Sequence, residues 1–417
     1  MFPPTSRDKQ YAARPFHVLV KPVGPLCNLD CEYCFYLKKG DLYPQSKRFE
    51  MNSSMLAVHI KQYIDSQPIG TPEVTFGWQG GEPTMRGLPF FRQVVELQQR
   101  YARPGMRINN TLQTNGVLLN DEWGQFLHQA QFLVGISIDG DQALHDKYRK
   151  TCSGRGSYLP VLKGLRMLQK HQVEFNILTA VQSDNAQHGV RVYQHLKQLG
   201  AHFIQFIPIV EPVKGQRVSH RSVTGKQFGQ FMIDVFELWR SNDIGKVFVG
   251  HFDNALAMHI GIPSSSCVHA TQCGDNIVLE HNGDVYSCDH FVYPDFQLGN
   301  IHNTVYSDLI ATARQKAFAQ RKVVGIEQHC VGCSQRALCN GACPAQRIDS
   351  NGELSARAKH YLCDGYFAFF SHIRPYLEAM SECLRRQQPV NEYTQFLGQE
   401  STIHGKVNHG EVNKTLS

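Results

Sequence analysis

The sequence predicts an α/β fold: a partial barrel of six parallel strands, followed by a smaller cysteine-rich domain with a β-hairpin and helices. Three observations carry this prediction. Short β-branched and aromatic runs alternate with segments of helical spacing between residues 16 and about 210, polar and glycine-rich residues follow these runs, and eight of the 13 cysteines lie between Cys267 and Cys363. A chain of 417 residues is long enough for both parts.

Six strands are predicted in the first part, at residues 16–20, 74–78, 107–113, 132–138, 175–181 and 203–209. Between them, apolar residues recur at helical spacing, as at Leu56, Ile60 and Ile64. Alternating strands and helices are typical of a parallel sheet covered by helices, and six units rather than the eight of a closed barrel predict an open one. A helix at residues 225–240 is expected to lead out of this barrel.

The second part contains a strong hairpin signal. Asn282 and Gly283 separate the apolar runs at residues 277–280 and 285–287, and Asn-Gly between such runs is typical of a two-residue turn. A helix follows at residues 365–385. We therefore divide the chain into an N-terminal arm (1–15), a barrel (16–240), a cysteine-rich domain (241–388) and a polar, flexible tail (389–417).

Composition and charge exclude several kinds of partner. The formal charge of +6 is spread along the chain without a basic run, so nucleic acid is not expected. No stretch reaches the roughly 18 apolar residues that a membrane span needs, so no membrane is expected either. An odd number of cysteines without a signal peptide argues against disulfides and favours metal or cluster ligands. We expect a soluble protein of the cytoplasm.

Three cysteines follow the first predicted strand. Cys27, Cys31 and Cys34 have C-x3-C-x2-C spacing, so they fall in one loop and can converge on one centre. Structural zinc takes four protein ligands, whereas an iron–sulfur cube held by three cysteines leaves one iron free to bind another group. A zinc knuckle with a distant fourth ligand is the alternative interpretation.

Polar and glycine-rich runs follow the next three strands. They are Gly-Gly-Glu-Pro at residues 80–83, Thr-Asn-Gly at 114–116 and Ser-Ile-Asp-Gly at 137–140. Any one of them is typical of an ordinary turn. Barrels of this kind place their chemistry at the C-terminal ends of the strands, so the serial position of these runs predicts one shared functional rim.

The cysteine loop, the 80–83 run and the His-Asp-x-x-Arg segment at 145–149 together resemble the radical S-adenosylmethionine (SAM) superfamily. The resemblance implies that Cys27, Cys31 and Cys34 hold a 4Fe–4S cluster whose free iron chelates SAM. It also implies that Glu82 offers an acceptor to the SAM amino group. By the same resemblance, the residues that contact SAM are Tyr33, Gly81, Glu82, Ser137, Arg149 and Val210.

The later cysteines resemble the SPASM domain of radical SAM peptide maturases. The pattern is C-x9-G-x4-C from Cys273 to Cys288, then C-x2-C-x5-C-x3-C from Cys330 to Cys343, then a last cysteine. The resemblance implies two auxiliary 4Fe–4S clusters, held by Cys267, Cys273, Cys288 and Cys343, and by Cys330, Cys333, Cys339 and Cys363. A zinc ribbon is the alternative for Cys330 and Cys333 alone. Cys152 and Cys383 remain as ordinary thiols.

Nearly the whole chain, from residue 16 to about 366, resembles the anaerobic sulfatase-maturating enzymes. The resemblance implies oxidation of a cysteine or serine in an unfolded or nascent sulfatase polypeptide, within a Cys/Ser-x-Pro/Ala-x-Arg segment, to Cα-formylglycine. It assigns the role of general base to Asp289, which follows Cys288. It also implies a flavodoxin- or ferredoxin-like reductant.

Two other functions stay open on the sequence alone. The cluster and SAM residues are shared with maturases that form thioether or other crosslinks in a different peptide. From another class, the chain could be a non-catalytic iron–sulfur or zinc scaffold, although a scaffold has no need for Gly81, Ser137 and Arg149 beside a three-cysteine site.

Overall fold

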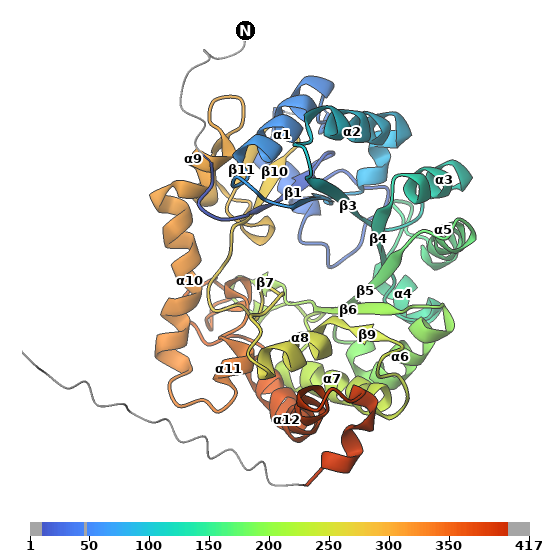
Figure 1. Ribbon diagram of the computed structural model, residues 1–417, viewed down its shortest axis with the longest axis vertical. Coiled ribbons are helices and arrows are strands. Elements are labelled where there is room, and N and C mark those ends of the chain that lie inside the picture. Colours follow the sequence, from blue (N-terminus) through green and yellow to red (C-terminus); the bar gives the residue numbers. More distant parts are fainter. Residues whose placement is uncertain (1–10, 46–47, 399–417) are drawn as a thin grey trace, which may run out of the picture.

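The computed structural model describes residues 11–45 and 48–398, and its centre is a 10-stranded sheet that curves into an open barrel (Figure 1). The barrel strands are parallel and follow the chain order. They are β1 (His17–Lys21), β2 (Glu73–Trp78), β3 (Arg107–Thr114), β4 (Phe132–Ser137), β5 (Phe175–Val181) and β6 (Phe203–Pro208). All six predicted strands are thereby confirmed, each to within one residue at either end.

Helices cover the outer face of this sheet (Figure 1). They are α1 (Ser53–Ser66), α2 (Gly87–Tyr101), α3 (Asp121–Gln129), α4 (Gln142–Tyr148), α5 (Tyr158–Lys170), α6 (Gly189–Gln198) and α7 (Gly225–Asn242). The alternation in β2 shows why the layers form: Val74, Phe76 and Trp78 are buried, and the residues between them are half-buried. Trp78 packs edge-on against Phe90 and Phe91 of α2.

Both edges of the sheet are completed by residues from the second half of the chain. Strand β10 (Asn276–Glu280) pairs in parallel with β1, so that Lys21 lies opposite Glu280, and continues through β11 (Asp284–Tyr286) to β12 (Gln297–Asn300). At the other edge, β9 (Phe248–Val249) pairs with β6. The predicted hairpin is present, but its loop has three residues, 281–283, rather than two, with Gly283 at φ +93°. One sheet therefore contains strands from both sides of the predicted domain boundary at residue 240.

The remaining helices lie on the open side of the barrel and below it in Figure 1. They are α8 (Gly250–His259), α9 (Tyr306–Ala311), α10 (Ala313–His329), α11 (Arg336–Cys339) and α12 (Cys363–Arg385). Two short strands, β7 (Pro212–Val213) and β8 (Arg217–Val218), form a separate pair. Helix α12 confirms the predicted C-terminal helix. Sequence analysis missed α10, although Thr312 caps its first turn and its composition favours a helix.

The first residues of the predicted flexible tail belong to the folded region. Residues Val390–Phe396 form a 3₁₀ helix in which Tyr393 and Phe396 are buried. The Tyr393 ring packs on Tyr376 of α12, and its hydroxyl accepts a hydrogen bond from Arg240 at 3.1 Å. Most of the predicted arm and tail, at residues 1–10 and 399–417, lies outside the described residues. Among those described, no helix combines the length and apolar character that crossing a membrane requires.

A glycine contact fixes α5 against the turn that follows β3. A Cβ atom on Gly164 would lie 2.0 Å from the carbonyl oxygen of Gly116, so Gly164→Ala must push the helix off this turn. We expect Gly164→Ala to lower the free energy of unfolding by about 1–3 kcal/mol, measured by urea denaturation. Gly250→Ala is the control, because the nearest atom to its added Cβ lies at 3.7 Å. An equal loss in both variants would contradict the contact.

Candidate active site and cysteine centres

The three N-terminal cysteines lie in one loop directly after β1. The thiols of Cys27, Cys31 and Cys34 interact electrostatically with one another, and burial is the main cause that raises the pKa of Cys27 and of Cys31 to about 12. Asn115, from the turn after β3, donates hydrogen bonds to Cys27 Sγ at 3.6 Å and to Asn28 Oδ1 at 2.8 Å. Buried thiols of high pKa become thiolates when they bind a cationic centre, so this donor set fits an iron–sulfur cluster.

The Gly-Gly-Glu-Pro run packs directly on the cysteine loop. The backbone of Gly81 has φ +48°, and a Cβ atom there would lie 1.9 Å from the carbonyl oxygen of Leu26, so only glycine fits. The next amide, of Glu82, donates a 2.8 Å hydrogen bond to that same oxygen. This close approach holds the loops after β1 and β2 together at the rim.

The side chain of Glu82 is completely buried and anchored by the protein itself. Its Oε1 accepts hydrogen bonds from the Thr84 amide, the Thr84 hydroxyl and the Thr114 hydroxyl, and its Oε2 accepts one from the Asn115 amide at 2.7 Å. Glu82 therefore joins the loops after β2 and β3. The predicted contact with the SAM amino group would use the remaining lone pair of Oε2, and it stays a prediction.

Tyr33 and Arg149 meet on a buried carboxylate that sequence analysis did not assign. Asp139 Oδ2 accepts hydrogen bonds from the Tyr33 hydroxyl and, at 2.9 Å, from Arg149 Nε, while Oδ1 accepts one from the Ala180 amide. Asp139 also stabilises the charge of Arg149, whose guanidinium interacts electrostatically with Cys31. The only sequence signal was its place in the 137–140 turn at the end of β4.

The guanidinium of Arg149 has hydrogen-bond donors that can serve a further anion. Its Nε is fixed by Asp139, and its two Nη groups make no hydrogen bond to any residue that the structure describes. Two parallel N–H donors match a carboxylate, which fits the predicted contact with the carboxylate of SAM. Ser137, which accepts a 3.2 Å hydrogen bond from Gln113, is the last residue of β4, and Val210 lies just after β6. Both remain candidates by position.

The electrostatic interactions among the eight later cysteines fall into two sets. In the first auxiliary group, the thiol of Cys343 interacts with those of Cys267 and Cys273, and the thiol of Cys288 interacts with those of Cys343 and Cys267. In the second auxiliary group, the thiol of Cys339 interacts with those of Cys363, Cys330 and Cys333. Cys343 thus interacts with Cys267 and Cys288 rather than with its sequence neighbours. The assignment of individual cluster ligands stays a prediction.

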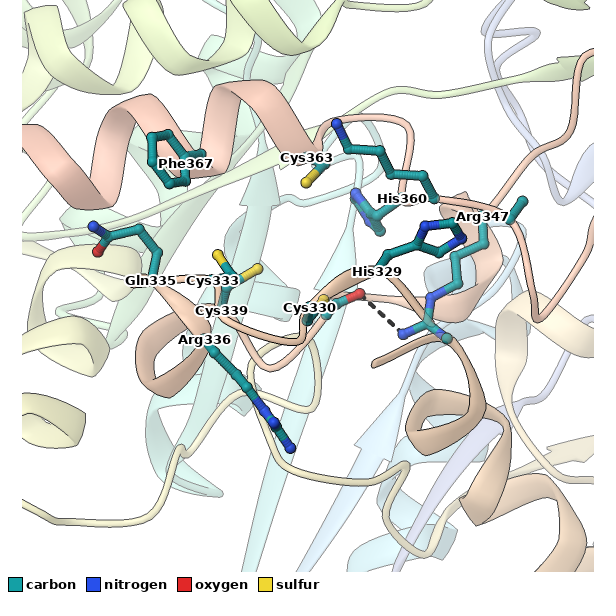
Figure 2. A pocket seen from close by; sticks show the side chains of 14 residues that line it. His329, Cys330, Cys333, Gln335, Arg336, Cys339, Arg347, His360, Cys363 and Phe367 are labelled. Atoms are coloured by element: carbon teal, nitrogen blue, oxygen red, sulfur yellow. Dashed lines mark hydrogen bonds between the residues drawn. The ribbon is translucent and has the colours of Figure 1, made fainter. Parts of the chain in front are cut away.

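The second auxiliary group lines a cavity whose wall contains a hydrogen-bond donor without an acceptor. Cys330, Cys333, Cys339 and Cys363 line this cavity together with His360 (Figure 2). The Nδ1 atom of His360 accepts a hydrogen bond from the Leu362 amide, so the proton sits on Nε2. That Nε2 is buried and has no partner. An N–H group without an acceptor beside four thiols fits a cluster with acceptor sulfur atoms.

An ion pair with Lys21 holds Asp289 next to the end of β1. Its Oδ2 is 3.7 Å from Lys21 Nζ, and its Oδ1 is 3.7 Å from Cys288 Sγ. Burial tends to raise the pKa of Asp289, but electrostatic interactions with His290 and Lys21 and hydrogen bonds from Cys288 and the His290 amide hold the pKa below its ordinary value. The side chain is 20% exposed, whereas Lys21 is 1% exposed. Lys21, a lysine that ends an apolar strand, was not among the predicted site residues.

Comparison with known proteins gives the class of the chain. Residues 22–196 match the model of the radical SAM superfamily, and residues 267–334 match that of an iron–sulfur cluster-binding domain, SPASM. The chain is a radical SAM enzyme with an auxiliary-cluster domain. Its cofactors are therefore SAM, the 4Fe–4S cluster that binds SAM, and auxiliary clusters.

Individual relatives identify the family within this class of enzymes. The chain is 40% identical to a serine-type anaerobic sulfatase-maturating enzyme of Bacteroides thetaiotaomicron, over 91% of this chain and 94% of that protein. It is 32% identical to a cysteine-type enzyme of Clostridium perfringens, over 87% and 97%. A solved structure of native anSMEcpe with bound AdoMet and Cp18Cys peptide matches with a TM-score of 0.81 at 32% identity, over 88% and 99%. The chain belongs to the anaerobic sulfatase-maturating enzymes.

The grouping of Cys343 can be tested by iron content. Cys288→Ala/Cys343→Ala removes two thiols from one auxiliary group, so we expect it to lose one cluster, or about four iron atoms. Cys339→Ala/Cys343→Ala removes one thiol from each group and leaves three, the number at the N-terminal site, so we expect it to keep more iron. Iron and sulfide analysis of the reconstituted proteins would contradict the grouping if the second pair lost one cluster and the first pair did not.

Proposed function

We propose that the enzyme oxidises a cysteine or serine side chain of a sulfatase polypeptide to Cα-formylglycine. The observation that carries the proposal is the position of Asp289. A carboxylate of lowered pKa lies between Cys288 of the first auxiliary group and Lys21 at the end of β1, the strand that leads into the SAM-binding cysteine loop. Family membership supports the same reaction.

The oxidation requires three transfers from the target, and the residues and cofactors have separate roles in them. The target loses one hydrogen atom from Cβ, one proton from its thiol or hydroxyl, and one electron. When bound, SAM and the clusters supply the hydrogen acceptor and the electron transfer. Asp289 accepts the proton, and the Lys21 charge keeps the carboxylate ionised beforehand. A serine target gives the aldehyde directly, whereas a cysteine target gives a thioaldehyde that water converts to the aldehyde with release of sulfide.

A cavity beside the first auxiliary group supports a peptide substrate. Its volume is about 450 Å³, and its lining includes Gln205 and Ile207 of β6, His290, Cys343 and Gln346. A concave site with polar and apolar lining residues can bind a polypeptide segment inserted into it. We place an unfolded or nascent sulfatase segment of the Cys/Ser-x-Pro/Ala-x-Arg type in this cavity.

Three further assignments belong to the proposal. The electron donor is a flavodoxin- or ferredoxin-like protein, because the SAM-binding cluster requires a low-potential reductant. The enzyme works in the cytoplasm, since its 13 free cysteines suit a reducing compartment. Residues 16–240 form the SAM-cleaving unit and residues 241–388 form the auxiliary-cluster unit.

Mass spectrometry of a substrate peptide tests the function. We expect the anaerobically reconstituted enzyme, given SAM and a strong reductant, to convert the cysteine or serine of a Cys/Ser-x-Pro-x-Arg peptide to an aldehyde that reacts with a hydrazide. A peptide that loses two hydrogens but carries no aldehyde would indicate a crosslinking maturase instead. 5′-Deoxyadenosine without any change in the peptide would contradict the choice of substrate.

The role of Asp289 predicts a split between two activities. We expect Asp289→Asn to retain SAM cleavage but to lower aldehyde formation at least tenfold, because the amide cannot accept the target proton. Both products are measured in one reaction by liquid chromatography and mass spectrometry. Asp295→Asn, in the exposed 3₁₀ turn that follows, is the matched control. Aldehyde formation at the parent rate in Asp289→Asn would contradict the general-base role.

The N-terminal site predicts a different result. We expect Cys31→Ala to abolish SAM cleavage, because two thiols cannot hold the open cluster. The measurement is release of 5′-deoxyadenosine, and Cys152→Ala, an exposed thiol outside the three groups, serves as the control. Parent-level cleavage by Cys31→Ala would show that the SAM-binding cluster lies elsewhere.

A further inference from the structure

A lysine is completely buried between the two auxiliary groups. Lys322, on the inner face of α10, has an exposed fraction of 0%. Its Nζ donates hydrogen bonds to the carbonyl oxygens of Cys267 at 2.8 Å and Val268 at 2.7 Å. No carboxylate of the described residues forms an ion pair with this ammonium.

An arginine is buried beside it. Arg347 is 1% exposed, and its two Nη groups donate hydrogen bonds only to carbonyl oxygens, including that of Lys322 at 2.9 Å. Two glycines make room for the guanidinium, because a Cβ atom on Gly325 would lie 2.0 Å from Nη1 and one on Gly341 would lie 2.8 Å from Nη2. Figure 2 shows Arg347 at the wall of the cavity enclosed by the second auxiliary group. Within the described chain it too lacks a carboxylate partner.

Two buried cations without a carboxylate are costly, since each loses its hydration and carbonyl dipoles replace it only in part. The groups that oppose this cost are the cysteines. Lys322 interacts electrostatically with Cys267, Cys273 and Cys343 of the first auxiliary group and with Cys339 of the second. Arg347 interacts with Cys330 and Cys339 of the second group and with Cys273 and Cys343 of the first. Each cation therefore interacts electrostatically with thiols of both groups.

We propose that Lys322 and Arg347 are shared counter-cations of the two auxiliary clusters, and that they raise the reduction potentials of both. Four thiolates give each cluster a net negative charge, which is the counter-ion that the two cations lack. Reduction adds one more negative charge in a site of low dielectric constant, so a nearby buried cation stabilises the reduced form more than the oxidised form. The two side chains thus make the auxiliary clusters better electron acceptors.

Redox titration of the auxiliary clusters, followed by electron paramagnetic resonance, tests this proposal. The auxiliary signals are those that do not change when SAM is added. We expect Lys322→Met and Arg347→Gln to lower the ratio of reduced to oxidised cluster at a fixed potential at least tenfold, a shift of about 59 mV toward negative potentials. Lys316→Met is the matched control, because Lys316 lies on the same helix but is exposed. Lys322→Arg keeps the charge and is expected to stay near the parent value.

Iron content separates the remaining outcomes. If Lys322→Met fails to load its auxiliary clusters but Lys322→Arg loads them, the counter-cation role stands, and the potential of Arg347→Gln decides the effect on reduction. If neither variant loads, Lys322 has a packing role and the proposal is wrong. The proposal is also wrong if Lys322→Met loads its clusters and they have the parent reduction potential. The proposal rests on the cluster assignment but not on the substrate. Auxiliary signals in the parent protein test that assignment, and aldehyde formation tests the proposed function separately.

Discussion

The parallel pairing of β1 with β10 is the interaction on which the active site depends. It joins residues that are far apart in the sequence and places Lys21 opposite Glu280 at the end of both strands. The SAM-binding cysteine loop continues from β1, and the hairpin that begins with β10 leads to Cys288 and Asp289. The ion pair between Lys21 and Asp289 then fixes the proposed base beside that loop. One sheet thus carries both the proposed SAM site and the proposed oxidation site.

The second constraint on the structure is the sign of the buried charges around each cysteine group. Around the SAM site, Asp139 orients Arg149 and Tyr33, and Glu82 holds the loops after β2 and β3. Around the auxiliary groups the signs are reversed, because buried cations face thiols and lack carboxylate partners within the described residues. An open cluster that binds a zwitterionic cofactor needs both signs nearby, whereas a cluster with four thiolates carries excess negative charge that cations compensate.

Local patterns in the sequence predicted the strands of the barrel, the hairpin turn and the cysteine loop, because these depend on neighbouring residues. The division of the cysteines into two groups followed from the family resemblance and not from spacing, since Cys343 crosses over in space. The roles of Lys21, Asp139, Lys322 and Arg347 were missed because each depends on a partner more than 100 residues away or on burial that periodicity does not reveal. The pairing of β10 with β1 was missed for the same reason, and with it the continuity of the two predicted domains.

The most direct test of the account follows a deuterium label. A substrate peptide deuterated at Cβ of the target residue is incubated anaerobically with the reconstituted enzyme, SAM and reductant, and the 5′-deoxyadenosine and the peptide are analysed by mass spectrometry. We expect one deuterium in 5′-deoxyadenosine for each aldehyde formed. Unlabelled 5′-deoxyadenosine, or a label transferred without aldehyde, would contradict the claim that this site oxidises a side chain to formylglycine.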